Sequence, residues 1–243
     1  MTSEEIKLHK LAAKKLGLVK DRAFEFISKN IGKISERDVH DYIISEFKKE
    51  GMVSDRALQI VASGGHTSDV HGYAGEAMIK KDSLIMIDIW ARLKEGHCPF
   101  ADITWMGYSG RKVPAKMQDI FNKVIFARDL ALDFIRKELK QKRFPKATEV
   151  DKVVRDYFAT FGIEKHFTHR TGHSLGFTNC HGHKFRFSKT TRKTIPPEEL
   201  FTIEPGIYFK GEFGVRSEID CYVTSDYKLV VTSGIQKEII KIW

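Results

Sequence analysis

Apolar residues recur at helical spacing in four stretches of the chain, arranged as two pairs. Side chains three and four residues apart lie on one face of a helix, so each stretch predicts an amphipathic helix. The predicted helices span residues 3–30, about 36–50, about 113–141 and about 147–161. Gly51 and Gly162 are expected to end the second and fourth helices, and Thr148 is expected to cap the start of the fourth.

Shorter runs rich in β-branched and aromatic residues follow each pair of helices and predict strands. These runs are residues 58–63, 84–91 and 101–106 in the first half, and 200–209, 214–224 and 227–234 in the second half. A Gly-Tyr-Ser-Gly turn at 107–110 is expected to separate the halves. Helices followed by strands, twice, predict an α+β fold with two pseudo-twofold-related halves. Because no segment rich in Pro, Gly or Ser divides the chain, residues 1–243 are predicted to form a single domain.

The composition is that of a folded globular protein, with 42% apolar and 30% charged residues. No apolar run approaches the ~20 residues needed to span a bilayer, and the first residues lack the apolar core of a signal peptide. We therefore expect no membrane association. The three cysteines, Cys98, Cys180 and Cys221, are far apart and odd in number, which argues against a disulfide framework or a zinc ribbon. These features favour a cytoplasmic location.

The formal net charge of +9 raises the question of a nucleic-acid partner. The Lys and Arg residues are spread along the predicted helices as solvated faces, and no motif for binding DNA or RNA accompanies them. Net charge alone does not identify a partner. We therefore expect no nucleic-acid binding.

Four acidic residues interrupt the strand-like runs, namely Asp88, Asp102, Glu204 and Glu218. A charged carboxylate among apolar strand residues is costly unless it is paired or binds a metal. Each acid alone is compatible with a strand-end residue that bonds to the backbone. Strands lying side by side would bring the four charges together, and divalent cations would relieve their repulsion. Carboxylates with one imidazole suit Mn²⁺ or Co²⁺, with Zn²⁺ or Fe²⁺ as alternatives.

A histidine-rich segment, residues 168–183, supplies candidate imidazoles. It contains His169, His173, His181 and His183 among Gly, Thr and Ser residues, and a further histidine, His71, follows a Gly-rich stretch. A histidine-rich surface loop without a chemical role is the alternative reading of this composition.

Five separated blocks, in order, resemble the signature of the pita-bread metallopeptidases, which include methionine aminopeptidase, aminopeptidase P and prolidase. The blocks read VHGY, IDIWA with ADIT, HRTGHSLG, TIEPGIY and GVRSE, and they cover nearly the whole chain. The resemblance implies the pita-bread fold. The HRTGH block, and an arginine two places before the last acid, are closer to aminopeptidase P and prolidase than to methionine aminopeptidase.

By this resemblance, five residues would hold two divalent metal ions. Asp88 would bind one ion, His173 and Glu204 would bind the other, and Asp102 and Glu218 would bridge the pair. Such a pair activates a shared water and stabilises the oxyanion formed on the attacked carbonyl. Glu204 would also accept the proton of the water.

The resemblance assigns roles to further residues. His71 would lie near the scissile nitrogen, His181 near the carbonyl oxygen, and His169 would position the substrate. Arg216 is expected on one strand face with Glu218, where it would steady that carboxylate or bind a substrate carboxylate. An ordinary cross-strand ion pair is the other reading. Thr104 is expected to support Asp102, with which it shares a face.

Some positions depart from the family pattern. Asp88 and Asp102 are about three residues further apart than usual, which a longer hairpin would accommodate, and Trp90 replaces the common glycine. Trp90 is read as either a core residue or a wall of the substrate pocket. His181 lies one residue further from His173 than is typical. The amino-terminal domain of typical aminopeptidase P and prolidase chains has no counterpart, so a homodimer remains an open expectation.

The predicted function is that of a metal-dependent aminopeptidase or dipeptidase that removes the first residue of short peptides at Xaa-Pro bonds. A hydrolase or lyase that acts on a non-peptide small molecule with the same metal pair is the alternative. A catalytically inactive binding module with the same fold is the third hypothesis. Retention of all five ligand positions and of the auxiliary histidines argues against it.

Overall fold

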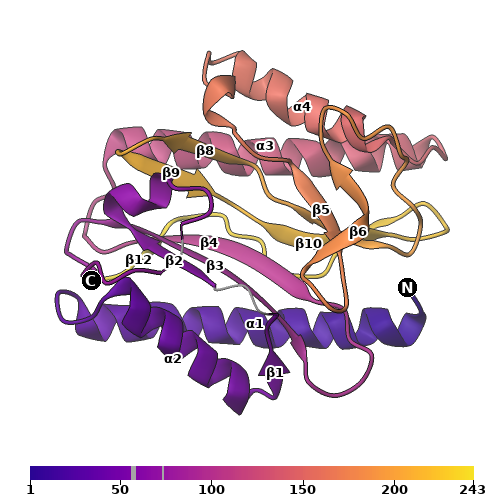
Figure 1. Ribbon diagram of the computed structural model, residues 1–243. Helices are drawn as coiled ribbons and strands as arrows, with labels where there is room; N and C mark the ends of the chain where they lie inside the picture. The colour runs from indigo at the N-terminus through magenta and orange to yellow at the C-terminus, as the bar shows by residue number, and fades with distance from the viewer. Residues whose placement is uncertain (56–58, 73) are drawn as a thin grey trace.

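The computed structural model describes residues 1–55, 59–72 and 74–243 (Figure 1). Its long helices are α1 (Ser3–Asn30), α2 (Glu36–Lys49), α3 (Ala115–Lys140) and α4 (Ala147–Ala159). Two short 3-10 helices, η1 (Gly64–Ser68) and η2 (Glu164–His166), complete the helical elements of the described chain. All four predicted helices are confirmed, and none of the described helices is long and apolar enough to cross a membrane.

Four helix ends follow the local chemistry of the sequence. Thr2 and Ser35 cap α1 and α2 through reciprocal capping boxes. Gly51 and Gly162 follow α2 and α4 with φ of 68° and 65°, a backbone conformation that glycine adopts without a steric penalty.

The predicted cap of α4 is wrong. Lys146 precedes the helix, and its backbone N–H donates to the Glu149 carboxylate at 2.7 Å. Thr148 lies within the first turn, and its backbone N–H donates to the Thr191 carbonyl, while that of Ala147 donates to the Lys193 carbonyl. Backbone carbonyls of residues 191–193 therefore accept hydrogen bonds from the first N–H groups of α4, and no side-chain cap is required.

The strands form two larger sheets and one hairpin. The first sheet contains β1 (Met52–Val53), β2 (Ile60–Ser63), β3 (Leu84–Leu93), β4 (Ala101–Tyr108) and β12 (Ile240–Lys241). The second contains β5 (Gly172–Leu175), β6 (His181–Phe187), β7 (Leu200–Ile203), β10 (Ile219–Val223) and β11 (Leu229–Val231). The hairpin pairs β8 (Gly206–Phe209) with β9 (Phe213–Arg216).

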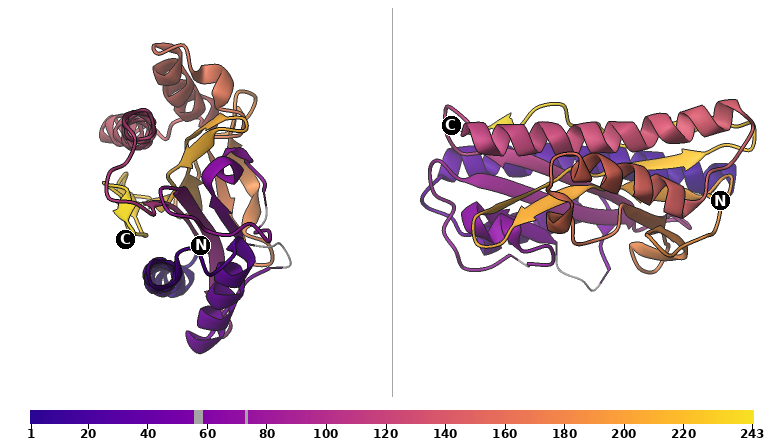
Figure 2. Two further views of the ribbon diagram at one scale, coloured as in Figure 1. Left: turned by 90° about the vertical axis from the view of Figure 1, so that its left-hand side faces the viewer. Right: turned by 90° about the horizontal axis from the view of Figure 1, so that it is seen from above.

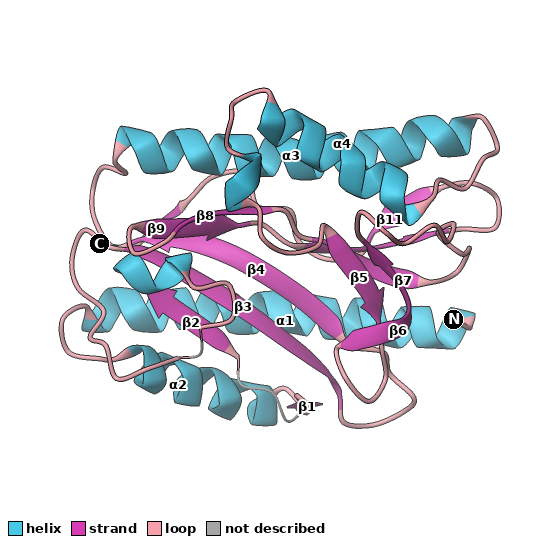
Figure 3. Cartoon of the chain, turned by 45° about the horizontal axis from the view of Figure 1, so that its top comes forward, coloured by secondary structure: helices cyan, strands magenta, loops and turns pink. Residues whose placement is uncertain are grey.

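Figure 1 shows α1 and α2 below the strands and α3 and α4 above them, and the left view of Figure 2 shows the long helices α1 and α3 on the same side of the strands. In Figure 3, α1 lies behind β3 and β4. Leu16, Val19 and Ile27 of α1 are fully buried in one apolar cluster with β3 and β4, and a second cluster joins α3 and α4 to β7, β9 and β10. The α+β prediction is confirmed, with helices and strands in the same order in both halves.

Several strand boundaries differ from the prediction. Leu58, in the predicted run 58–63, lies outside the described residues, and β4 continues through the expected turn as far as Tyr108. The predicted strand 200–209 is interrupted at Glu204 and Pro205, and the predicted strand 214–224 is interrupted at Ser217 and Glu218.

These two interruptions have one physical origin. Pro205 has no backbone N–H for a strand ladder, and its carbonyl accepts a hydrogen bond from Ser217 at 3.2 Å. At this point the chain changes partners, because β7 pairs with β5 and β10 whereas β8 pairs only with β9. Glu204 and Glu218 thus lie at breaks between sheets, not within regular strands.

Candidate metal centre and active site

The hairpin of β3 and β4 carries the first two acids. Its register pairs Asp88 with Thr104 and Trp90 with Asp102, so the two acids are diagonal neighbours across the strands. Diagonal positions lie on the same face of a sheet. The loop at 94–100 takes up the extra residues between them, as the sequence predicted.

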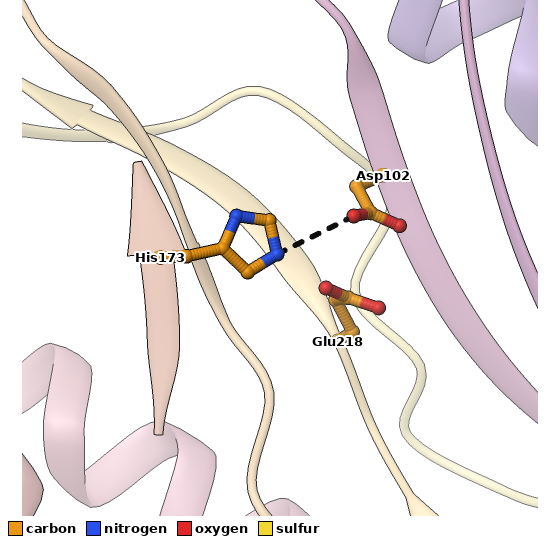
Figure 4. A group of neighbouring side chains, drawn as sticks. All are labelled: Asp102, His173 and Glu218. Atoms are coloured by element: carbon orange, nitrogen blue, oxygen red, sulfur yellow. Dashed lines mark ion pairs between the residues drawn. The ribbon is translucent and has the colours of Figure 1, made fainter. Parts of the chain in front are cut away.

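The second half of the chain contributes the other donors. His173 lies in β5, and its Nε2 atom is 3.6 Å from Oδ2 of Asp102 and 3.3 Å from Oε1 of Glu204. Donor atoms of Asp102, His173 and Glu218 all lie within 4.8 Å of one another. Figure 4 shows the His173 imidazole directed at Asp102, with the Glu218 carboxylate beside both.

All nine predicted site residues line one cavity of about 620 Å³. They are Asp88, Asp102, His173, Glu204 and Glu218, the proposed ligands, with His71, His169, His181 and Arg216. Trp90 and Cys180 also line this cavity. His183, the fourth histidine of the histidine-rich segment, is not among its lining residues.

The surroundings of the four carboxyl groups in the cavity disfavour their ionised forms. Burial, followed by repulsion from neighbouring carboxylates, raises the pKa of Asp102 and of Glu218 well above the usual value. Burial also raises the pKa of Asp88, and it raises that of Glu204 to about 7. The Oδ1 atom of Asp102 is buried without a hydrogen-bond partner among the residues that the structure describes. Clustered, partly unsatisfied carboxylates fit a divalent cation as the missing partner.

The state of His173 also suits a metal. Burial, with the nearby His181, lowers the pKa of His173 to about 3, so its ring is neutral at physiological pH. The Nδ1 atom donates to the Ser174 carbonyl at 3.0 Å, which leaves Nε2 as the acceptor facing Asp102 and Glu204. This bond to the Ser174 carbonyl fixes the tautomer that a metal ligand requires.

Neighbouring groups hold the carboxylates in place. Thr104 donates to Oε2 of Glu218 at 2.7 Å, whereas the sequence analysis expected it to support Asp102. Thr202, which sequence reasoning missed, donates to Oε1 of Glu204 at 3.0 Å. Its position two residues before Glu204 places both on one strand face, which is the signal that could have identified it.

The expected partner of Arg216 is wrong. Its guanidinium forms a buried ion pair with Asp88, not with Glu218, and it also donates to the Tyr208 hydroxyl at 2.7 Å and to the Val70 carbonyl at 2.7 Å. The chain breaks between β9 and β10, so Arg216 and Glu218 do not share a continuous strand face.

Tyr208 links Arg216 to His169. The Nδ1 atom of His169 donates to the Arg170 carbonyl at 2.8 Å, so Nε2 accepts from the Tyr208 hydroxyl at 2.8 Å. Burial lowers the pKa of His169 well below its usual value, so this ring is also neutral. The sequence analysis missed Tyr208, because nothing local in the run TIEPGIY marks its hydroxyl as a site group.

The other two histidines lie at the open side of the cavity. His181 is exposed, and its ring packs edge-on against that of His173 with centroids 4.2 Å apart. His71 is exposed as well, and its backbone N–H donates to Asp69 at 3.2 Å. Both side chains are therefore free to contact a molecule that enters the cavity.

The chain is similar in sequence to a known protein family. A match to metallopeptidase family M24 extends over residues 7–225. The chain belongs to this family. An uncharacterized peptidase of Bacillus subtilis, YqhT, is 31% identical over 240 residues, which are 98% of this chain and 64% of the relative. The family is described as one of metallopeptidases.

Solved structures establish the fold. A prolidase from Thermococcus sibiricus superposes with a TM-score of 0.86 and 30% identity. The superposition covers 99% of this chain and 61% of the prolidase chain. An Xaa-Pro dipeptidase from Bacillus anthracis superposes with a TM-score of 0.84 and 28% identity, and the superposition covers 99% of this chain and 63% of the dipeptidase chain. The predicted pita-bread fold is confirmed. This chain matches only the catalytic part of these proteins, under two thirds of their length.

Proposed function

We propose that the protein is an exopeptidase that removes the first residue of short peptides at Xaa-Pro bonds, with two divalent metal ions. The observation that carries the proposal is the convergence of Asp88, Asp102, His173, Glu204 and Glu218 in one cavity. The names of the two superposed enzymes, a prolidase and an Xaa-Pro dipeptidase, favour the Xaa-Pro specificity.

The proposed ligand assignment follows the contacts. His173 and Glu204 would hold one ion, since Nε2 and Oε1 are 3.3 Å apart, and Asp88 would hold the other. Asp102 and Glu218 would bridge them. When bound, the metal pair supplies Lewis-acid polarisation of the scissile carbonyl and of an attacking water. The carboxylate-rich donor set favours Mn²⁺ or Co²⁺, with Zn²⁺ or Fe²⁺ as alternatives.

Glu204 is the proposed proton acceptor. Its side chain is 13% exposed and lines the cavity, and its Oε1 atom accepts a hydrogen bond from Thr202. A carboxylate beside the attacking water is suited to accept the proton of that water. Glu204 would therefore take the proton of the attacking water and return it to the leaving nitrogen.

The remaining site residues would bind and orient the substrate. The two exposed histidines are suited to donate to the peptide, with His71 near the scissile nitrogen and His181 near the carbonyl oxygen. His169, held by Tyr208, would position the residue after the scissile bond. Arg216 acts in this proposal as a positioning residue, because its guanidinium fixes Asp88 and does not need to contact the substrate.

One observation favours the alternative of a non-peptide substrate. The Trp90 side chain lines the cavity beside the acids, and its indole N–H donates to Asp55 at 2.9 Å. This fixed wall narrows the space available to a substrate. A dinuclear hydrolase or lyase for a compact small molecule is therefore the second candidate.

Hydrolysis of a peptide panel tests the proposal. Chelator-stripped protein is reloaded separately with Mn²⁺, Co²⁺ and Zn²⁺ and given Xaa-Pro dipeptides, Xaa-Pro-Xaa tripeptides and Met-Ala controls. Metal-restored cleavage confined to the Xaa-Pro members is expected, and the dipeptide-to-tripeptide ratio separates dipeptidase from aminopeptidase action. Tight metal binding without cleavage of any peptide would favour the non-peptide candidate.

Three further points belong to this proposal. Residues 1–243 form one catalytic domain, since both helix pairs pack on strands that supply the same cavity. The three free cysteines favour a reducing compartment such as the cytoplasm. A homodimer is part of the proposal as a possible assembly.

A further inference from the structure

Cys180 brings a sulfur atom to the carboxylate cluster. It immediately precedes β6, its side chain is 2% exposed, and it lines the cavity. The Sγ atom lies 2.9 Å from Oδ2 of Asp102, the same oxygen that faces Nε2 of His173 at 3.6 Å. The thiol is therefore adjacent to the position where Asp102 and His173 would share an ion.

The position of this sulfur is fixed by the backbone. The N–H of Cys180 donates to Asp55 at 3.0 Å, and Asp55 in turn accepts from the Trp90 indole. Cys180 occupies the buried position against Asp102, while His181 is exposed at the cavity.

A second observation points to a ligand at this place. Asp102 is 4% exposed and its Oδ1 atom has no hydrogen-bond partner among the described residues. The hydrogen bond from Cys180 satisfies only the other oxygen. A buried carboxylate with an unsatisfied oxygen, beside a buried thiol and a neutral imidazole, is the donor chemistry of a metal site.

We propose that Sγ of Cys180 is a further ligand of the metal centre, on the ion held by Asp102 and His173. This inference rests on the proposed function. On binding, the S–H proton is released to solvent and the sulfur binds as a thiolate. A thiolate is a soft donor, so it shifts the preference of an otherwise carboxylate-rich centre from Mn²⁺ toward Zn²⁺ and Co²⁺.

The competing explanation is that Cys180 only donates a hydrogen bond that orients Asp102. The two roles differ in whether sulfur contacts the ion. A cobalt–thiolate bond produces a sulfur-to-metal charge-transfer absorption in the near ultraviolet, whereas a hydrogen-bonded thiol does not. Cobalt alone is therefore a suitable probe.

The experiment titrates the chelator-stripped full chain with up to two equivalents of Co²⁺ and records bound metal and absorption. The wild type is compared with Cys180→Ser and with Cys221→Ser, a matched control in β10 whose buried thiol does not line the cavity. We expect the charge-transfer band in the wild type and in Cys221→Ser, and its loss in Cys180→Ser. The ratio of Zn²⁺ to Mn²⁺ affinity is expected to fall at least about tenfold in Cys180→Ser only.

X-ray absorption of the cobalt-loaded wild type provides a test that needs no variant. A cobalt–sulfur distance near the ~2.3 Å typical of metal–thiolate bonds is expected. Bound cobalt without a charge-transfer band or a sulfur neighbour would overturn the role of Cys180 and leave the two-metal proposal intact. Failure of the wild type to bind cobalt would overturn both.

Discussion

The buried ion pair of Arg216 and Asp88 permits a quantitative prediction. The two side chains are only 6% and 5% exposed, so Arg216→Met leaves Asp88 without its cationic partner in a poorly solvated place, where the carboxyl must stay charged or take up a proton. Removing one partner of a buried pair costs about 3–5 kcal/mol. The lost hydrogen bond to the Val70 carbonyl adds to this cost. We expect the free energy of unfolding of the metal-free protein to fall by about 4 kcal/mol.

Denaturant unfolding of the chelator-stripped protein measures this loss. Arg22→Met is the control, because the Arg22 side chain is 39% exposed in its ion pairs with Glu46 and Glu50 and its loss is expected to cost under about 1 kcal/mol. Adding Asp88→Asn to Arg216→Met removes the uncompensated charge and should restore part of the stability. A loss of under about 1 kcal/mol for Arg216→Met, matching the control, would refute the reasoning.

Three other predictions concern the acids of the cavity. Glu204→Gln should preserve the fold but lower turnover at least about 100-fold, and near-normal turnover would remove Glu204 from the mechanism. Thr104→Val should weaken metal affinity about 10–100-fold by freeing the Glu218 carboxylate, whereas Thr104→Ser should retain it; equal affinities would contradict the role of the hydroxyl. Because the pKa of Glu204 is raised from 4.5 to about 7, its contribution to the stability of the metal-free protein is full below pH 4.5 and is lost as the pH rises through 7. Melting temperatures should therefore fall over this window without metal and change less with metal bound; a rise without metal would contradict the assignment.

The sequence predicted what depends on local periodicity and on the chemistry of single residues. The four helices follow from apolar spacing, and Asp88 was identifiable because a charged side chain is costly among apolar strand residues. His173 was singled out only by the resemblance of its block to the metallopeptidases. All nine predicted site residues line the same cavity.

The contacts between distant segments were not predictable in the same way. The partner of Arg216 depends on the strand break at Ser217, which in turn depends on a hydrogen bond to Pro205 from another segment. The sulfur of Cys180 reaches Asp102 across 78 positions of sequence. Likewise, carbonyls beyond residue 190 replace the side-chain cap expected at Thr148. Tertiary contacts decided each of these points, and no local pattern encodes them.

A crystal structure of the manganese-loaded protein with an anomalous difference map tests the central claim most directly. Two peaks about 3.5–4 Å apart are predicted, with Asp102 and Glu218 between them. Asp88 should contact one ion, and His173 and Glu204 the other. A fully loaded crystal with no peak in the cavity, or with manganese bound elsewhere, would contradict the two-metal centre and the peptidase mechanism built on it.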